Sequence, residues 1–265
     1  MFLKPIFPTE MHKKTAEIIY DFFSKISTID SILVVNSCAR GQAAPESDLD
    51  FAILVKEGTE SSEISDIEQK WLKFSNNNST ISDYKKLNKF NHIHLDLING
   101  IYTAQNIEIG EPWDYFEIEI GNHICYSAPI GSKGNFFNKL QEKWLPYYDE
   151  NLRLQRLNMT INAFRYDIDH INIFIKRELY FHAFDILCKA FQEFLQALFI
   201  ANKTYPIAYN KWIKFQIIEL LNKPELYPLL SPILSISCIE SNEIIEKSKQ
   251  LSDLLNKLID TNSDK

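Results

Sequence analysis

The chain contains 265 residues, of which 45% are hydrophobic and 24% are charged, and its formal net charge is −7. This composition is ordinary for a folded protein and excludes a chain that is mainly disordered. The acidic balance disfavours nucleic acid as a partner, because proteins that bind long polyanions neutralise the phosphates with basic residues. A neutral or cationic partner is favoured instead.

Neither a membrane segment nor a metal-binding cysteine motif is visible in the sequence. No uncharged apolar stretch reaches the roughly 18 residues that a membrane span needs, and no secretory leader is recognisable. The four cysteines are far apart and form no CxxC pair, which argues against a zinc site. We therefore expect a cytoplasmic protein with reduced thiols, while the oligomeric state stays open.

The first half of the chain alternates helical and strand patterns. Apolar residues at three- and four-residue spacing indicate helices, and β-branched runs indicate buried strands. The expected helices span residues 10–26 and 64–74, and the expected strands span 32–35, 48–55 and 93–98. The weaker expectations are a tight connection or short helix over 37–45, a loop over 75–82, strands over 115–120 and 123–126, and a turn-rich break over 130–134.

The second half has a different character, since glycine does not occur after Gly134. Three prolines between residues 223 and 237 leave room there for short helices only. The expected helices span residues 136–144, 152–175, 179–201, 209–221 and 239–259. We predict an α+β fold, in which an α/β-type domain with a mixed sheet over 1–133 is followed by an all-α helical bundle domain over 134–265.

Two carboxylates open the strand over residues 48–55. Because strand side chains alternate, Asp48 and Asp50 point to one face of the sheet and Leu49 points to the other. Two neighbouring carboxylates repel each other and shift each other's pKa, a conflict that a bound divalent cation resolves. Hard oxygen ligands favour Mg²⁺ or Mn²⁺ as that cation.

A third carboxylate, Asp96, lies in the last clear strand pattern and shares a face with His92 and His94. If this strand lies beside the first, three carboxylates converge, and such a set can hold two Mg²⁺ ions about 3.5–4 Å apart. Asp83 and Asp114 compete for this position, but neither lies in a clear apolar alternation. The two histidines are more simply half-buried strand residues than ligands or proton relays.

The segment between the first two strands carries Ser37 and Arg40. A serine hydroxyl and exposed backbone amides after a strand can hold phosphate oxygens. Arg40 can pair with a phosphate, or only with Glu46 or Asp48. Cys38 is expected to be a small buried residue rather than a nucleophile.

The stretch from Ser37 to Asp50, SCARGQAAPESDLD, resembles the core motif of the polymerase-β-like nucleotidyltransferase superfamily. That motif has a glycine–serine pair after a strand, then a D-x-D pair and a distant third aspartate, for which Asp96 is the candidate. The two-domain organisation most resembles the branch of bacterial antibiotic nucleotidyltransferases, which act on aminoglycosides and lincosamides. The helical half matches that branch in architecture and in one looser segment.

This looser segment covers residues 202–212, where an aromatic–proline stretch precedes a Lys-Trp pair. In related two-domain members a lysine of the helical domain reaches the triphosphate. The resemblance implies that Lys211 is this lysine, and that Tyr205 or Tyr209 contacts substrate. The expected nucleotide-binding residues are therefore Ser37, Arg40, Lys211 and Tyr205.

One residue departs from the family motif, because Asn36 stands where the family has glycine. Glycine permits a positive φ and the close approach of a phosphate, and asparagine tolerates the left-handed region better than most residues. We expect the turn to survive and the side chain to crowd the triphosphate, which affects rate and nucleotide affinity more than the fold.

The resemblance implies a Mg²⁺-dependent nucleotidyltransferase. Asp48, Asp50 and Asp96 are the expected catalytic and metal-binding residues for two Mg²⁺ ions, with Mn²⁺ as an alternative metal. The expected reaction moves a nucleoside monophosphate, in the first instance AMP from ATP, onto a hydroxyl of a small molecule such as an aminoglycoside-like antibiotic. Asp96 is the first candidate for the base, and Glu117 and Glu119 are weaker ones.

Two alternatives stay open. One keeps the chemistry and changes the acceptor to a protein hydroxyl or an RNA end, although the chain has no long basic run. The other is a nucleotide-binding or partner-binding module with a decayed site, such as half of a toxin–antitoxin pair. Asn36 supports the decayed site, and the retained Ser37 and the three aspartates oppose it.

Overall fold

The computed structural model describes residues 3–105 and 114–263. By its contacts the chain divides into two compact units, which are described separately. Unit 1 comprises Met1–Thr103 and Glu119–Leu145, and unit 2 comprises Ala104–Ile118 and Pro146–Lys265. The boundary expected after residue 133 places helix 136–144 in the second domain, whereas its contacts place it in unit 1.

Unit 1 is built on a four-stranded mixed sheet, in the order β3-β2-β1-β4. The strands are β1 (Ile29–Val34), β2 (Leu49–Val55), β3 (Ile93–Ile98) and β4 (Ala128–Ser132). β1 runs antiparallel to β2 and β4, and β2 runs parallel to β3. The predicted mixed sheet is therefore confirmed.

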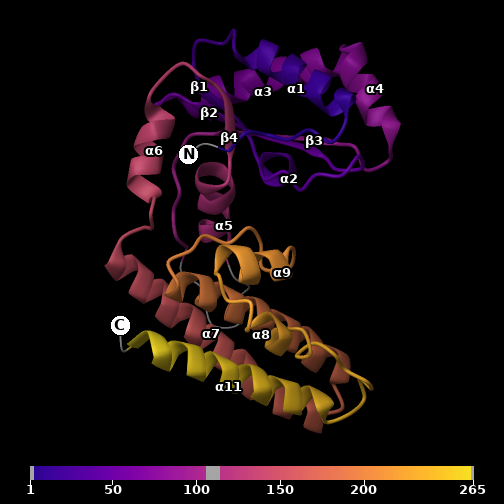
Figure 1. The fold of residues 1–265 in the computed structure, drawn as a ribbon, viewed down its shortest axis with the longest axis vertical. Coiled ribbons are helices and arrows are strands. Elements are labelled where there is room, and N and C mark those ends of the chain that lie inside the picture. Colours follow the sequence, from indigo (N-terminus) through magenta and orange to yellow (C-terminus); the bar gives the residue numbers. More distant parts are fainter. Residues whose placement is uncertain (1–2, 106–113, 264–265) are drawn as a thin grey trace. The chain divides into compact units, whose positions relative to one another are not determined.

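Helices α1, α3 and α4 lie together beside the sheet (Figure 1). The helical elements up to residue 145 are α1 (Glu10–Phe23), α2 (Asn36–Ala39), α3 (Ser61–Asn76), α4 (Ser79–Leu87), α5 (Phe116–Ile120), the π-helical turn η1 (Gly121–Cys125) and α6 (Phe136–Trp144). The core under α1 and α3 is formed by alternate residues of β2, since Leu49, Phe51 and Ile53 pack in one hydrophobic cluster with residues of both helices. The intervening residues of β2 therefore face the other side of the sheet.

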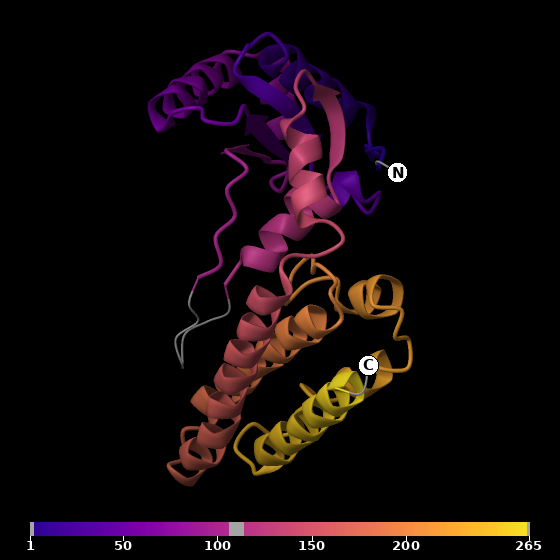
Figure 2. The ribbon, with the colours of Figure 1, turned by 90° about the vertical axis from the view of Figure 1, so that its left-hand side faces the viewer.

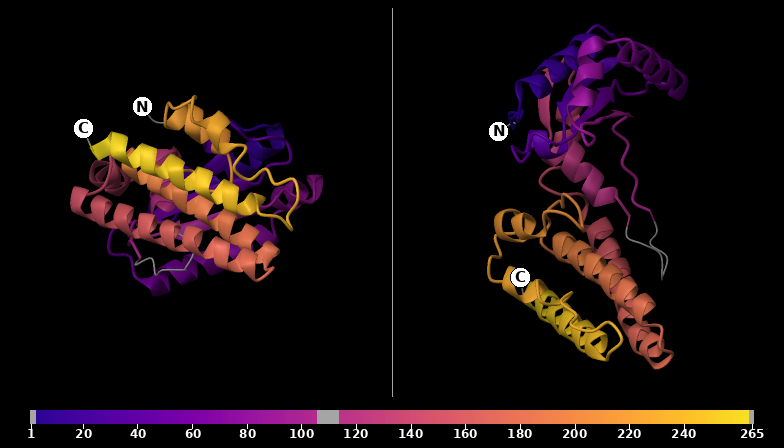
Figure 3. Two further views of the ribbon diagram at one scale, coloured as in Figure 1. Left: turned by 90° about the horizontal axis from the view of Figure 1, so that it is seen from below. Right: turned by 90° about the vertical axis from the view of Figure 1, so that its right-hand side faces the viewer.

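Unit 2 is helical, and α7 (Glu150–Lys176), α8 (Tyr180–Ala201) and α11 (Glu243–Ser263) run side by side in it (Figures 2 and 3). Asp149 caps α7 by accepting hydrogen bonds from the backbone N–H groups of Asn151 and Leu152. The shorter elements are α9 (Ile213–Phe215), the π-helical turn η2 (Gln216–Leu220) and α10 (Tyr227–Leu230). The predicted all-α region is confirmed, and no helix in the described ranges is long and apolar enough to cross a membrane.

Several expected elements were wrong. Most of residues 75–82, expected to be a loop, lie in α3 and α4, and the strands expected over 115–120 and 123–126 are α5 and η1. The break expected over 130–134 overlaps β4, and the helix expected over 209–221 begins only at Ile213. In contrast, strand 93–98 and helix 136–144 have the predicted bounds.

Candidate functional site

The register between β2 and β3 fixes how the three predicted carboxylates lie. Asp50 pairs with His94 and Ala52 pairs with Asp96 in the parallel ladder. Because side chains alternate along both strands, Asp50, His94 and Asp96 project from the same face, and that face is opposite to the one that packs under α1 and α3. Asp48 lies one residue before β2, on the side of Asp50 away from Asp96.

Asp48 is anchored at the start of β3. Its Oδ1 atom accepts a hydrogen bond of 2.8 Å from the backbone N–H of His92, and its Oδ2 atom lies 3.5 Å from Nε2 of His94. The side chain of Asp48 keeps 35% of its surface exposed. One carboxylate oxygen is thus held by the protein while the group stays accessible.

Asp50 is a partly buried carboxylate with incomplete charge compensation. Burial raises its pKa, and the neighbouring charge of Asp48 acts in the same direction. The side chain of Asn36, and then the charges of His94 and Arg40, partly oppose this shift. A cation near Asp48 and Asp50 would therefore be favoured electrostatically.

Asp96 is exposed, and its surroundings include two residues that the sequence did not single out. His123, in η1, is buried so that its pKa is lowered, an effect that the charge of Asp96 opposes. Its ring centroid lies 6.1 Å from that of Tyr102. Within the described residues, His123 Nδ1 and the Tyr102 hydroxyl are buried without a hydrogen-bond partner.

The segment after β1 begins with a residue in the left-handed region. Asn36 adopts a φ of 57°, a conformation that glycine adopts readily and that asparagine tolerates. Ser37 follows it in the short helix α2. Arg40 donates hydrogen bonds to Gln42 and Asn122 rather than to a carboxylate, and burial lowers its pKa to about 10 against the opposing charge of Asp50. Ser37 and Arg40 thus lie on the loop that leads from β1 back to the carboxylates.

Cys38 is buried in this loop. Burial raises the pKa of its thiol to about 12, with the charge of Asp50 adding to the effect. The thiol is therefore protonated and unreactive at neutral pH, as expected for a packing residue.

In unit 2 the two expected nucleotide contacts differ in exposure. Lys211 is exposed just before α9. Tyr205 is only 2% exposed, and its ring centroid lies 4.7 Å from that of Tyr147. Tyr209 is likewise 1% exposed. This burial argues against direct substrate contacts by both tyrosines and favours a packing role.

Glu117, a weaker candidate for the base, has a structural role instead. It is fully buried and accepts hydrogen bonds from Arg156 Nε, Arg156 Nη2 and the Tyr148 hydroxyl, at 2.5, 2.7 and 2.8 Å. Asp114, a competitor for the third carboxylate, pairs with the same guanidinium group. Both carboxylates are thereby engaged by Arg156 within unit 2.

The other competitor for the third carboxylate, Asp83, lies in α4 and pairs with Lys86 at 3.9 Å. Throughout residues 3–105 and 114–263, no group of three or more His, Cys, Asp or Glu side chains is close enough to hold a metal ion by itself. Any cation at Asp48 and Asp50 must therefore take further ligands from elsewhere, such as phosphate oxygens.

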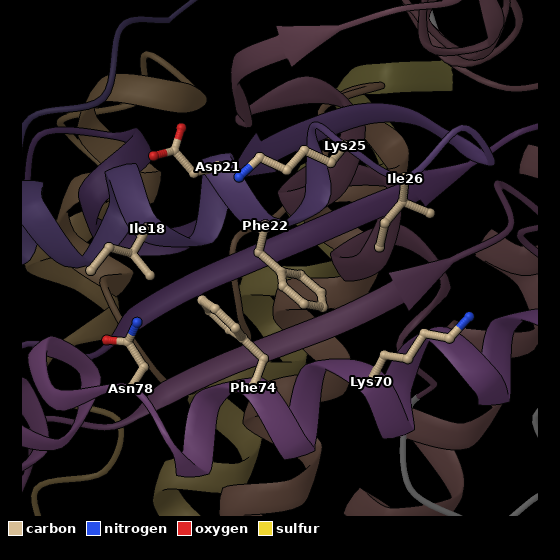
Figure 4. A pocket seen from close by; sticks show the side chains of 8 residues that line it. All are labelled: Ile18, Asp21, Phe22, Lys25, Ile26, Lys70, Phe74 and Asn78. Carbon is tan, nitrogen blue, oxygen red and sulfur yellow. The ribbon is translucent and has the colours of Figure 1, made fainter.

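A pocket of about 520 Å³ lies between α1 and α3, away from the predicted site residues (Figure 4). Phe22 and Phe74 face each other across it, with ring centroids 4.7 Å apart, and Lys25 and Lys70 lie at its sides. None of the expected catalytic or nucleotide-binding residues lines this pocket.

Comparison with known proteins bears on the part of the chain that carries these carboxylates. Residues 13–121 match the family described as the nucleotidyltransferase domain. The match includes Ser37, Asp48, Asp50 and Asp96, so nucleotidyl transfer is the general activity that this domain supports. No functionally curated protein matches the chain.

Among solved structures, the chain is similar to a nucleotidyltransferase-like protein from Exiguobacterium sibiricum. The identity is 14%, the TM-score is 0.44, and the alignment covers 93% of this chain and 75% of the other. The statement about nucleotidyl transfer rests on the sequence match of residues 13–121 and not on this structural likeness.

Proposed function

We propose that the protein is a divalent-metal-dependent nucleotidyltransferase that moves AMP from ATP onto a hydroxyl of a small-molecule acceptor. The observation that carries the proposal is the β2–β3 register, because it puts Asp96 on the face of Asp50 within a nucleotidyltransferase domain. The proposed catalytic and metal-binding residues are Asp48, Asp50 and Asp96.

The donor chemistry of this face fits a hard divalent cation. Asp48 and Asp50 offer carboxylate oxygens at the start of β2, and the pKa of Asp50 is raised by its burial and further by the charge of Asp48. A bound Mg²⁺ or Mn²⁺ would neutralise phosphate charge and make the acceptor hydroxyl more acidic. Asp48 and Asp50 would hold it, with Asp96 as a further ligand.

The remaining residues bind and orient the substrates. Ser37 donates its hydroxyl hydrogen to a phosphate oxygen, and Arg40 is close enough to Asp50 to feel its charge and can pair with the same phosphates. Lys211 is an exposed cation that supports triphosphate binding. These groups contribute by positioning and by stabilising charge rather than by forming a covalent intermediate.

In the proposed reaction, the acceptor oxygen bonds to the α-phosphorus while the bond from that phosphorus to the pyrophosphate oxygen breaks. The hydroxyl proton passes to the exposed carboxylate of Asp96, and pyrophosphate leaves. Glu117 is not the base, because its carboxylate is fully buried and held by Arg156.

A small cationic acceptor suits the net charge of −7, and the resemblance to antibiotic nucleotidyltransferases suggests an aminoglycoside-like compound. We propose this acceptor class ahead of a protein or RNA hydroxyl. The positive φ of Asn36 supports a competent phosphate loop over a decayed one, since it is the conformation for which a glycine at this position would be suited.

The test incubates the protein with Mg²⁺ and each of ATP, GTP, CTP and UTP, against a panel of aminoglycosides and lincosamides and a cell lysate. Pyrophosphate release and the intact mass of the products are measured for the wild type, Asp48→Asn and Asp96→Asn. Asp83→Asn, the same change at an exposed helix position, is the matched control.

An acceptor heavier by one nucleoside monophosphate, formed by the wild type and Asp83→Asn but not by the other two variants, supports the proposal. Transfer that persists in Asp96→Asn would show that another group supplies the third carboxylate. Absence of pyrophosphate release with every mixture would refute the activity.

A further inference from the structure

A second pocket, of about 570 Å³, lies in unit 2 and is lined largely by aromatic and aliphatic side chains. Its volume is in the range of small-molecule sites. Trp212, Phe215 and Tyr227 supply ring surfaces, and Lys214 and Glu219 supply the charged groups. All of these residues come from α9, η2, α10 and the residue before α9.

Trp212 is held in a strained conformation at this pocket. Its φ is 58°, which is an outlier for a bulky residue, and its surface is 43% exposed. Strain of this kind persists only where the surrounding structure enforces it, and it concentrates at ligand-binding sites. More than half of its surface is buried, and the rest stays accessible to a ligand.

The strain is enforced by Gln216, whose side chain is fully buried. Its Oε1 atom accepts a hydrogen bond of 2.7 Å from the backbone N–H of Ile207, and its Nε2 atom donates to the carbonyl oxygens of Ala208 and Lys211 at 2.7 and 2.8 Å. Gln216 also begins the π-helical turn η2, a rare geometry that is frequent at functional sites. The loop is therefore held in one conformation before Trp212, part of whose surface stays exposed.

The chemistry of the lining selects a class of ligand. Aromatic faces stack on planar bases with little dependence on sequence. The carboxylate of Glu219 accepts hydrogen bonds and donates none, so it favours a ligand that carries an amine. Lys214 lies over the Tyr227 ring, with Nζ 5.8 Å from the centroid. Its ammonium group suits a phosphate.

We propose that this pocket binds a nucleotide whose base carries an exocyclic amine, with the base stacked on Trp212, the amine donating to Glu219 and the phosphate near Lys214. The choice of a nucleotide as the occupant rests on the proposed function. The pocket is observed independently of that function. Adenine has such an amine and hypoxanthine has a carbonyl group in its place, so AMP binds and IMP is disfavoured.

The experiment titrates AMP and IMP into the full-length protein in EDTA, by calorimetry and by tryptophan fluorescence. EDTA removes the divalent cations on which binding at the carboxylates depends. The variants are Trp212→Gly, which suits the positive φ and so preserves the fold, and Glu219→Gln. Phe181→Ala, at a ring that is 72% exposed on α8, and Asp50→Asn are the controls.

We expect AMP to bind the wild type at one site, and Trp212→Gly to weaken binding about tenfold or more, the effect of losing one stacked base. The preference for AMP over IMP should disappear in Glu219→Gln, and both controls should bind AMP like the wild type. Equal affinity of AMP and IMP for the wild type, or unchanged affinity in Trp212→Gly, would overturn the proposal.

The design separates the two proposals. AMP binding that is lost in Asp50→Asn and kept in Trp212→Gly would overturn the pocket and leave the proposed function standing. AMP binding that depends on Trp212, in a protein that releases no pyrophosphate from any nucleotide, would support the pocket and refute the proposed function.

Discussion

Replacing Glu117 with glutamine tests the structural role that unit 2 gives to this residue. The carboxylate is fully buried and accepts four hydrogen bonds, two from Arg156 and one each from Tyr148 and Gln196. Glutamine has the same shape but only one acceptor oxygen, and its NH₂ group would face a guanidinium that also donates. The change therefore removes the charge pair and leaves donors facing each other.

The expected loss follows from the environment of Arg156, which is 1% exposed. Breaking one side of a buried ion pair costs about 3–5 kcal/mol. Asp114 still compensates the guanidinium charge, since Nη2 of Arg156 also donates to that carboxylate. The free energy of unfolding should therefore fall by about 3 kcal/mol, the lower end of this range. This corresponds to a fall in Tm of about 6–12 °C.

The assay is thermal and urea unfolding of the wild type and Glu117→Gln, with Glu225→Gln as the matched control. Glu225 is an exposed acid of unit 2, and its change should alter stability by no more than about 0.5 kcal/mol. Below its Tm, Glu117→Gln should retain the pH profile of nucleotide turnover. Wild-type stability in Glu117→Gln, or loss of turnover in a fully folded sample, would refute this reasoning.

Two further predictions concern a buried acid and the phosphate loop. Burial and then the neighbouring Asp167 raise the pKa of Glu193 from 4.5 to about 8. The folded protein thus keeps a proton that the unfolded chain releases, and the stability from this group is complete below pH 4.5 and lost as the pH rises towards about 8. Glu193→Gln should flatten the fall in Tm over this interval, and an unchanged slope would contradict the assignment. Asn36→Gly should keep the fold, because glycine accepts a φ of 57°, and should raise kcat/KM for ATP in steady-state assays by opening space for phosphate. A lower kcat/KM would instead show that the Asn36 side chain is needed beside Asp50.

The fold could be predicted where the periodicity of the apolar residues agrees with the residues that end a helix or strand. Strand 93–98 and helix 136–144 have uninterrupted periodicity and clear ends, and both bounds are confirmed. The start of α4 was missed although a signal exists. Asn78, which was counted as part of a polar loop, caps the helix by accepting a hydrogen bond from the backbone N–H of Ile81.

Other elements depend on contacts that are distant in sequence. Residues 116–120 alternate like a strand, but they form a helix in which Glu117 reaches Arg156, 39 positions away. β4 contains Pro129 and Gly131, which resemble a break, yet it is an edge strand that pairs with β1, where proline is tolerated. A Cβ atom at Gly131 would lie 2.5 Å from the Tyr20 ring, so a larger residue there would have to displace that side chain.

The candidate site likewise has features that follow from local sequence pattern and features that depend on contacts distant in sequence. The shared face of Asp50 and Asp96 was predictable, because it needs only strand alternation and a parallel neighbour. His123 and Tyr102 were missed because residues 123–126 were interpreted as a strand, whereas 121–125 form η1, and because the segment after β3 gave no clear pattern. A buried polar side chain beside Asp96 is visible only once the chain has folded.

The most direct test of the central claim measures binding of Mn²⁺ and ATP to the wild type, Asp50→Asn and Asp83→Asn by electron paramagnetic resonance, because this needs no acceptor. Coordination to the Asp48 and Asp50 carboxylates predicts saturable binding of Mn²⁺ with ATP to the wild type and Asp83→Asn, weakened about tenfold or more in Asp50→Asn, since a metal ligand is lost. Equal binding by Asp50→Asn and the wild type would contradict the claim that these carboxylates form a metal-dependent nucleotide site.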